Sequence, residues 1–253
     1  MQLDRTRLFA VGLIAVCVLG SGQRPGGAAV GAASATQSAA AQKIDLAERL
    51  GAGKLKPVNR EATKAQGSPD AVHLSEKEAV GLAWIDGSDF AQGTIELDVR
   101  GRDVLQQSFL GIAFHGKDDK TYEAVYLRPF NFRAADPARH QHAVQYVSAP
   151  DFDWPRLRQE FPEEFENPVD PSVSPTDWVA LKVIVNAKTV QIFVGSVKAP
   201  ALEVRKLGQL DRGMMWQCRS QLPFRSGTHV IVIVPPEGTT CVTTRRWRSG
   251  SIG

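Results

Sequence analysis

Apolar residues recur at every second position in two neighbouring segments, Trp178–Asn186 and Thr189–Val194. Both segments are rich in Val and Ile, and they are separated only by Ala187 and Lys188. This alternation is the pattern of a strand with one buried face, and so short a connection joins antiparallel neighbours. The pattern therefore predicts a β-hairpin, and it is followed by a further strand-like segment, Pro200–Val204.

Strand-like segments recur through most of the chain, and helical periodicity hardly occurs. Turns rich in Asp, Gly and Lys, such as Asp86–Ser88 and Lys117–Lys120, separate them. That spacing predicts an all-β sandwich or jelly roll of two antiparallel sheets. The other predicted strands are Ala71–Leu74, Gly81–Ile85, Gly93–Val99, Ser108–Phe114, Tyr122–Leu127 and Ala143–Val147.

One segment, Ala149–Pro175, breaks the strand pattern with many prolines and acids. Long loops on β scaffolds commonly hold a ligand, so a binding site is expected close to it. The loop acids do not have the spacing of a calcium site, and they are interpreted as a solvated charge run. These acids are Glu160, Glu163, Glu164 and Glu166.

The region from Arg128 to Trp154 combines aromatic and planar polar side chains. A sugar is recognised by an aromatic face that stacks on its C–H groups and by planar donors and acceptors that bridge its hydroxyls. We therefore predict a ligand surface here. The alternative is that these residues only pack the core and that Arg128 pairs with an acid of the long loop. The predicted ligand residues are Arg128, Asn131, His142, Gln145, Tyr146, Asp151 and Trp154.

Five segments follow one another in an order that is familiar from known proteins: Gly93–Arg100, Phe109–Phe114, Tyr122–Phe132, His142–Val147 and Trp178–Val204. Together they resemble the concanavalin A-like lectin and glucanase superfamily, and within it exported bacterial domains of the 3-keto-disaccharide hydrolase type. The resemblance covers Leu55–Leu207. It implies two curved antiparallel sheets with sugar bound on the concave sheet or its rim, and hence a carbohydrate partner.

Glucanases of that superfamily carry Glu-x-Asp-x-Glu or a bulged form of it, and Glu96 and Asp98 are similar to its first two acids. Alternation places both acids on one strand face. Arg100 stands where the third acid would be, so the acid/base of a retaining mechanism is missing. We interpret the pair as a solvated strand face, with catalysis as the alternative.

His140 and His142 lie one residue apart at the expected start of a strand, so they are expected to point the same way. Histidine can act as an acid or base near neutral pH. Because no third metal ligand is identifiable, we predict no metal and no cofactor, and the two residues are interpreted first as surface histidines.

The amino terminus predicts export. Arg5 and Arg7 precede the apolar run Leu8–Leu19, which is shorter than the ~20 residues of a membrane-spanning helix but suits a secretory signal. Residues 1–41 are expected to be a signal peptide and a small-residue linker, and the protein to be periplasmic or secreted. The alternative is an uncleaved leader, which would be the protein's only contact with a membrane.

Composition adds little to this picture. The formal net charge is +3 and no nucleic-acid-binding motif is present, so no nucleic-acid partner is expected. Cys218 and Cys241 follow the leader, and export would allow them to pair. The sequence leaves open whether they pair and how many copies of the chain associate.

The carboxyl-terminal region departs from the family pattern. Residues 42–207 are expected to form the sandwich, and residues 208–253 to be an atypical tail. The tail is expected to be disordered, out of frame or a divergent last strand, and only Thr228–Val234 within it has a strand pattern. Without a closing strand, a neighbouring strand would expose an unpaired edge.

The sequence therefore predicts an exported, lectin-like β-sandwich that binds a saccharide or an envelope glycan. One alternative is a glycoside hydrolase or lyase that acts on a modified sugar. The other is a protein-interaction module. A sandwich scaffold by itself does not choose among these functions.

Overall fold

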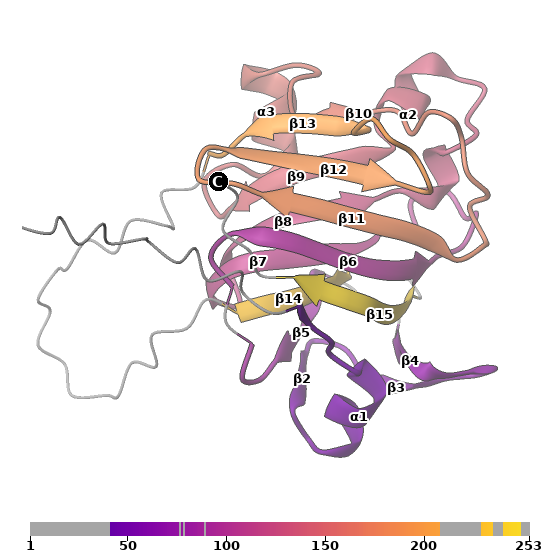
Figure 1. Ribbon diagram of the computed structural model, residues 1–253. Coiled ribbons are helices and arrows are strands. Elements are labelled where there is room, and N and C mark those ends of the chain that lie inside the picture. The colour runs from indigo at the N-terminus through magenta and orange to yellow at the C-terminus, as the bar shows by residue number, and fades with distance from the viewer. Residues whose placement is uncertain are drawn as a thin grey trace, which may run out of the picture. The chain divides into compact units, whose positions relative to one another are not determined.

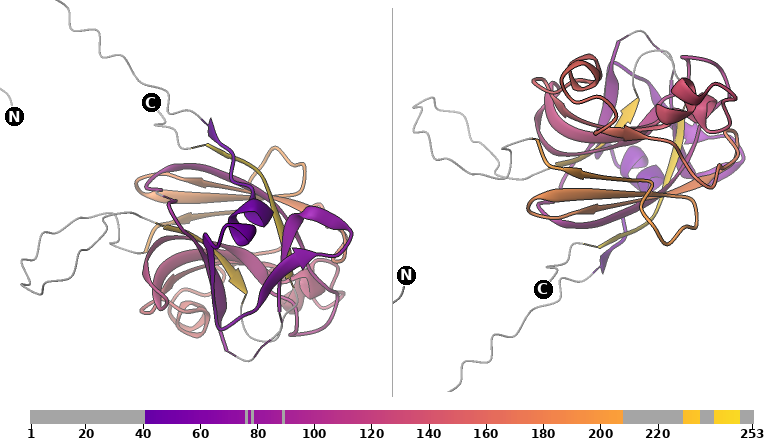
Figure 2. Two further views of the ribbon diagram at one scale, coloured as in Figure 1. Left: turned by 90° about the horizontal axis from the view of Figure 1, so that it is seen from below. Right: turned by 90° about the horizontal axis from the view of Figure 1, so that it is seen from above.

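The computed structural model of the chain describes residues 41–75, 77, 79–88, 90–207, 229–234 and 240–248. Across these residues, a pair of antiparallel sheets packs face to face (Figure 1), and the views in Figure 2 separate the two layers. The arrangement confirms the all-β sandwich that the hydrophobic alternation predicts.

The first sheet has eight strands. Its order is β13 (Leu202–Arg205), β12 (Thr189–Val194), β11 (Val179–Val185), β6 (Gly93–Arg100), β15 (Thr240–Arg248), β4 (Ser68–Leu74) and β3 (Ala62–Ala65), with β1 (Ala41–Gln42) paired to β15. The second sheet has seven strands. Its order is β10 (Glu166–Asn167), β9 (Val144–Ala149), β8 (Thr121–Leu127), β7 (Leu110–Asp118), β14 (His229–Val234), β5 (Gly81–Ile85) and β2 (Leu55–Val58).

The predicted hairpin is β11 followed by β12, with Val183 opposite Ile192. Buried and partly exposed residues alternate along the whole of β11. β-Branched side chains suit such a half-buried pleated surface. The alternation also fixes the register, because a slip of one residue would move every buried side chain to the solvent face.

The inward faces of the two sheets form one hydrophobic core. Leu97 and Val183 of the first sheet and Ile112 and Val125 of the second are at most 2 % exposed. Burying one such side chain contributes roughly 1.5–3 kcal/mol before its loss of conformational entropy is subtracted. The outward faces are left to carry polar and functional side chains.

Two strands from the carboxyl-terminal region lie inside the sheets, so the predicted boundary after Leu207 is too early. β14 (His229–Val234) lies within the expected strand Thr228–Val234 and pairs with β5 and β7 on either side. β15 lies between β6 and β4 and was not expected, because its Thr- and Arg-rich sequence lacks apolar alternation. Backbone pairing on both sides selects the strand here, and it removes the edges that would otherwise be open.

Short helices lie in the loops of the second sheet. α2 and α3 each begin after an aspartate, Asp136 or Asp153, whose carboxylate accepts a backbone N–H of the first turn. His140 and His142 lie in and just after α2 and not at the start of a strand, so the expectation that they point the same way is wrong. The helical elements are α1 (Leu46–Gly51), the 3-10 turn η1 (Pro129–Asn131), α2 (Pro137–Gln141) and α3 (Trp154–Glu160).

Three of the sequence predictions fall on residues outside the described ranges of the chain. They are the leader at residues 1–40, the pairing of Cys218 with Cys241, and the character of residues 208–228, 235–239 and 249–253. Among the residues that the structure describes, no helix has the length and apolar character needed to cross a membrane.

Candidate functional site

A pocket of about 660 Å³ opens on the outward face of the second sheet. Its floor includes Tyr122, Ala124 and Tyr126 of β8, together with Val147 and Ala149 of β9. These are alternate residues of neighbouring strands, so they project from the same face. The pocket has the size of typical small-ligand sites, about 300–1,000 Å³.

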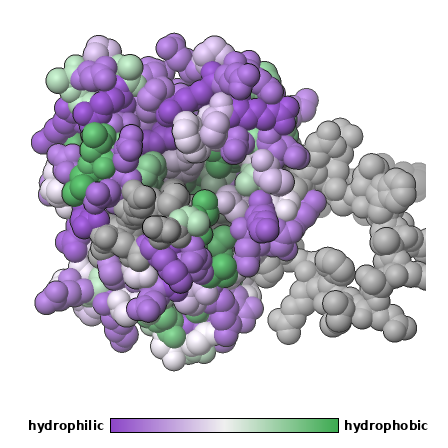
Figure 3. Space-filling view, turned by 180° about the vertical axis from the view of Figure 1, so that it is seen from behind, coloured by the Kyte–Doolittle hydropathy of each residue, from purple (hydrophilic) through white to green (hydrophobic). Residues whose placement is uncertain are grey.

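Apolar side chains that the core does not absorb gather at this pocket. Within the described residues four large hydrophobic side chains are exposed, and Val80, Leu105 and Trp154 are three of them that line the pocket. Figure 3 shows this side of the molecule, with green hydrophobic surface near its centre. Such a concentration on one hollow is typical of a binding surface. The remaining lining residues are Gln106, Phe109, Arg128, Phe130, Asn131, Arg139, His142, Asp153 and Arg158.

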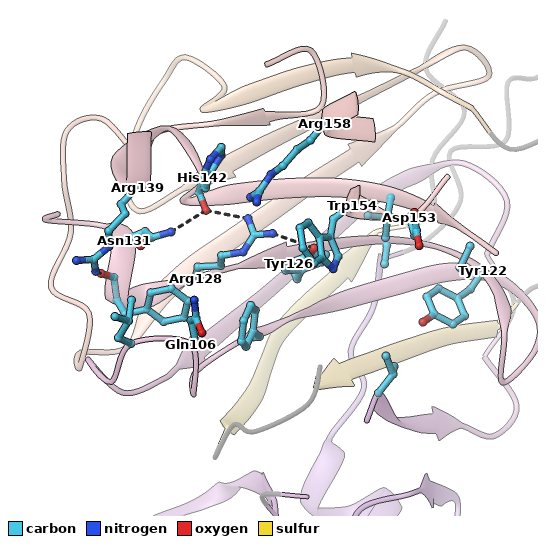
Figure 4. Close-up of a pocket in the computed structure, with 17 residues that line it drawn as sticks. Gln106, Tyr122, Tyr126, Arg128, Asn131, Arg139, His142, Asp153, Trp154 and Arg158 are labelled. Carbon is cyan, nitrogen blue, oxygen red and sulfur yellow. Dashed lines mark hydrogen bonds between the residues drawn. The ribbon is translucent and has the colours of Figure 1, made fainter. Parts of the chain in front are cut away.

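Arg128 follows β8 directly, and the fold fixes its guanidinium. Nη1 donates to the His142 carbonyl at 2.8 Å, while Nη2 donates to the Tyr126 hydroxyl at 3.1 Å and to Gln145 Oε1 at 3.2 Å. Asn131 Nδ2 donates to the same His142 carbonyl at 3.2 Å (Figure 4). These polar groups are therefore held in place before any ligand arrives, which lowers the entropy cost of binding.

A buried carboxylate, Glu166 of β10, organises the basic side chains. Arg158 Nε donates to its two oxygens at 2.9 and 3.0 Å, and Arg158 Nη2 donates to Oε2 at 2.8 Å. His142 Nδ1 lies 2.9 Å from Oε1, and Arg128 Nη1 lies 3.8 Å from Oε2. Glu166 is only 3 % exposed, so its assignment to a solvated charge run is wrong, although the other three loop acids are exposed. A buried charge requires such partners.

Burial lowers the pKa of His142 below its ordinary value of 6.5, and the charges of Arg158 and Arg128 act in the same direction while Glu166 opposes them. The imidazole is therefore neutral at neutral pH. Because Nδ1 faces a carboxylate, it carries the proton, and Nε2 is left as an acceptor.

Acidification is expected to destabilise the protein through His142. The folded pKa lies below the unfolded one, so the unfolded chain binds more protons once the pH falls below about 6.5, and the contribution present above that pH is lost. Replacing His142 with Asn keeps an N–H donor but removes the titration. The melting temperature of the variant should then fall less than that of the wild type between about pH 7 and pH 5. Equal slopes in thermal unfolding would contradict this role.

Trp154 is the first residue of α3 and is 47 % exposed. Its ring borders the pocket and is not packed under the long loop. Arg158, one helical turn later, has its guanidinium carbon 4.9 Å from the ring centroid, a cation–π distance. Phe109 continues the aromatic lining, with its ring centroid 6.3 Å from that of Tyr126 and 5.4 Å from that of Phe130.

The structure brings four predicted ligand residues to the pocket and corrects the position of the others. Gln145 and Tyr146 are fully buried and do not line it. The segment before β10 covers them, since Gln145 Nε2 and Tyr146 N both donate to the Phe165 carbonyl, at 3.1 and 2.9 Å. Asp151 is exposed in the turn before α3 and also lies outside the lining. The four that line the pocket are Arg128, Asn131, His142 and Trp154.

The sequence interpretation does not include several lining residues, among them Tyr126, Arg139, Asp153 and Arg158. Alternation along β8 could have indicated that Tyr126 shares a face with Tyr122. The spacing of four between Trp154 and Arg158 has meaning only on a helix, and α3 was not expected. Arg139 carries no such signal, because its position depends on how α2 packs.

The acids considered for catalysis lie on the other sheet. Glu96 and Asp98 belong to β6, and no residue of β6 is among the described lining of the pocket. Glu96 is partly exposed opposite Lys182, as expected for a solvated strand face, whereas Asp98 is 5 % exposed and buried.

No protein-family model and no curated protein matches the chain. Among solved structures, the carbohydrate recognition domain of Emp46p is similar with a TM-score of 0.50 and 11 % identity, over 81 % of this chain and 92 % of that one. The carbohydrate-binding module CBM66 from Bacillus subtilis gives a TM-score of 0.46 and 10 % identity, over 76 % and 92 %. The VIP36 exoplasmic/lumenal domain, in a Ca²⁺/Man3GlcNAc-bound form, gives 0.43 and 8 %, over 79 % and 85 %.

At such low identities these similarities concern the fold. The similarity to the Emp46p domain agrees with the two antiparallel sheets of the described residues. These similarities do not show that the chain is similar to domains of the 3-keto-disaccharide hydrolase type in particular. The chain thus forms a concanavalin A-like jelly-roll sandwich.

Proposed function

We propose that this is an exported carbohydrate-binding protein and that the pocket on the second sheet holds its saccharide. The observation that carries the proposal is the lining, in which Trp154, Phe109 and Tyr126 border the same hollow as Arg128 and Asn131. Aromatic rings stack on sugar C–H faces, and guanidinium and amide groups bridge hydroxyls. The carbohydrate recognition domain of Emp46p, which has the same fold, supports this class of ligand.

Export is the component of the proposal that rests on sequence alone. A basic start followed by a short apolar run supports it. Cell fractionation with sequencing of the mature amino terminus tests it, and intact Met1 in the cytosol would contradict it.

Replacing Trp154 with Ala is expected to weaken saccharide binding by about 1–2 kcal/mol, or roughly 5- to 30-fold in Kd. That is the contribution of one aromatic stacking contact together with the area it buries. Because Trp154 is about half exposed, the melting temperature should change little. A glycan array identifies a ligand, and isothermal titration calorimetry then measures both proteins with it.

Trp178→Ala is the matched control for this substitution. Trp178 is also partly exposed and also carries an arginine, Arg100, 4.9 Å from its ring centroid, but it lies outside the described lining of the pocket. Its loss should leave the affinity unchanged. If the two substitutions weakened saccharide binding equally, Trp154 would not be part of the binding site.

A second candidate function is hydrolysis or elimination on a modified sugar, as the resemblance to 3-keto-disaccharide hydrolase domains implies. The contact between His142 Nδ1 and Glu166 favours it, because a neutral imidazole oriented by a buried carboxylate is suited to general base catalysis. Chromatography of oligosaccharides incubated with the protein would reveal products. His142→Asn should then abolish turnover and retain binding. If the wild-type protein binds the oligosaccharides but forms no product, the enzymatic function is excluded and only the binding function remains.

A further inference from the structure

Charge is distributed unevenly along the pocket. Arg128, Arg139 and Arg158 lie towards one end, which we call the arginine end, together with Asn131 and His142 (Figure 4). Tyr122 and Asp153, the single acid of the described lining, lie towards the opposite end. Aromatic rings lie against the arginines, since the Arg128 guanidinium lies over Phe109 and Tyr126 and that of Arg158 lies over Trp154. A ligand at the arginine end therefore meets positive charge and aromatic surface together.

The acids close to the pocket do not cancel the positive charge. Glu166 lies behind the arginine end and is 3 % exposed, so its carboxylate binds protein side chains such as Arg158 and does not face the ligand. Asp153 lies at the opposite end, where its carboxylate accepts the Arg156 backbone N–H at 3.1 Å and caps α3. Three arginines thus face two carboxylates while His142 is neutral, which leaves the pocket with an excess of positive charge.

Several polar groups at the arginine end are available to a ligand. Arg139 Nη2 donates to the Phe130 carbonyl at 2.9 Å, but its Nε is buried and has no hydrogen-bond partner within the described residues. Asn131 Oδ1 is also buried and has no hydrogen-bond partner within the described residues, and Asn131 is 3 % exposed. The bonds of Arg158 to Glu166 use Nε and Nη2, so Nη1 can meet a ligand. Buried polar groups normally have hydrogen-bond partners. A buried polar group without a protein partner therefore indicates a place where a ligand or a water molecule forms the hydrogen bond.

We propose that the arginine end binds an anionic substituent of the saccharide, a carboxylate or a sulfate, so that the protein selects acidic over neutral saccharides. This inference rests on the proposed function and names its ligand class. Guanidinium groups match carboxylate and sulfate oxygens with paired N–H donors, and such charge-assisted bonds are stronger than neutral ones. Asn131 Oδ1 accepts a neighbouring sugar hydroxyl, and the aromatic side chains contact the ring.

The test compares each acidic saccharide with its own neutral form. Uronate oligosaccharides of several stereochemistries are titrated by calorimetry, alongside the same oligomers after reduction of their carboxyl groups to alcohols. The acid is expected to bind at least about tenfold more tightly at low salt, which corresponds to about 1.4 kcal/mol. This advantage should shrink between about 0.1 M and 1 M salt, as the Debye length falls from about 10 Å to about 3 Å. Sulfated oligosaccharides and their desulfated forms distinguish the two anions.

Arg139→Gln tests the arginine end with the least disturbance of the fold, because Arg139 is only partly buried and lies outside the network of Glu166. The variant should lose most of the preference for the acid, because loss of the guanidinium weakens binding of the acid more than binding of the neutral form. Arg139→Lys retains the charge without the paired donors and should give an intermediate preference. Arg133→Gln is the control, since Arg133 is exposed, lies nearby in sequence and does not line the pocket.

Each outcome decides a separate point. Equal affinity for an acid and its neutral form would overturn this inference and leave the proposed carbohydrate function standing. Loss of preference in Arg133→Gln as large as in Arg139→Gln would assign the effect to general surface charge and also overturn it. Failure of every saccharide, acidic or neutral, to bind would overturn the inference and the proposed function together.

Discussion

Replacing Glu123 with Gln is expected to lower the free energy of unfolding by about 3–5 kcal/mol. For a domain of this size, the melting temperature would fall by about 10 °C. Glu123 lies on the inward face of β8 and has no exposed surface. The substitution keeps the volume of the side chain and removes its charge, so the loss measures electrostatics and not packing. Chemical denaturation or calorimetry provides the measurement.

The effect should be large because the Glu123 carboxylate compensates buried polar groups of both sheets. The Tyr146 hydroxyl donates to Oε2 at 2.6 Å, and His115 Nδ1 lies 3.0 Å from Oε1. Lys206, which follows β13 of the first sheet, has its Nζ 3.7 Å from Oε1, and its side chain is 4 % exposed. Removal of one partner leaves the others in a medium where an uncompensated charge is costly.

Two further variants of the chain distinguish this effect from a general loss of acidic charge. Glu164 pairs with Arg205 at 2.8 Å on the surface, with 44 % and 51 % of the side chains exposed, so Glu164→Gln should cost less than about 1 kcal/mol. Adding Lys206→Met to Glu123→Gln removes the buried cation that lies beside residue 123, and it should restore some of the lost stability. If Glu123→Gln cost no more than Glu164→Gln, the buried cluster would not hold the sheets together.

The strands could be predicted where one face is buried and the other is wet. The expected bounds of Gly81–Ile85 and Thr189–Val194 are those of β5 and β12. β15 could not be predicted, because its strand conformation is imposed by β6 and β4 on either side and not by its own pattern. The helices α2 and α3 are shorter than the windows over which helical periodicity can be recognised.

The polar side of the site was predictable only residue by residue. Arg128 and Trp154 have side chains that suit a sugar, and both reach the pocket. Glu166 follows three exposed acids, and no local pattern shows that it is buried, since that depends on β10 folding back onto β9. His115 follows the inward Phe114, so alternation would turn it outward. An irregularity in β7, where His115 has φ 54°, turns it towards Glu123 instead.

Replacing Glu166 with Gln is expected to lower the free energy of unfolding by about 2–3 kcal/mol. The figure is below that for Glu123 because Arg158, its closest partner, keeps 30 % of its side chain in water and is partly screened there. His142 should respond as well. Glu166 is the charge that raises the pKa of His142, so this pKa should fall further below 6.5 in the variant. An NMR titration of the imidazole follows that pKa while denaturation follows stability.

Glu160→Gln is the control for this prediction, because Glu160 accepts the same kind of hydrogen bond from an arginine but is exposed to solvent. Arg156 Nε lies 2.9 Å from Glu160 Oε1 on the exposed side of α3, and Arg158 Nε lies 2.9 Å from Glu166 Oε1. Glu160→Gln should leave both the melting temperature and the titration of His142 unchanged. A common response of the two variants would mean that the long loop is stabilised by its net charge. A response of Glu166→Gln alone would mean that one buried carboxylate sets both the position of Arg158 and the protonation of His142, and therefore the charge that the pocket presents to its ligand.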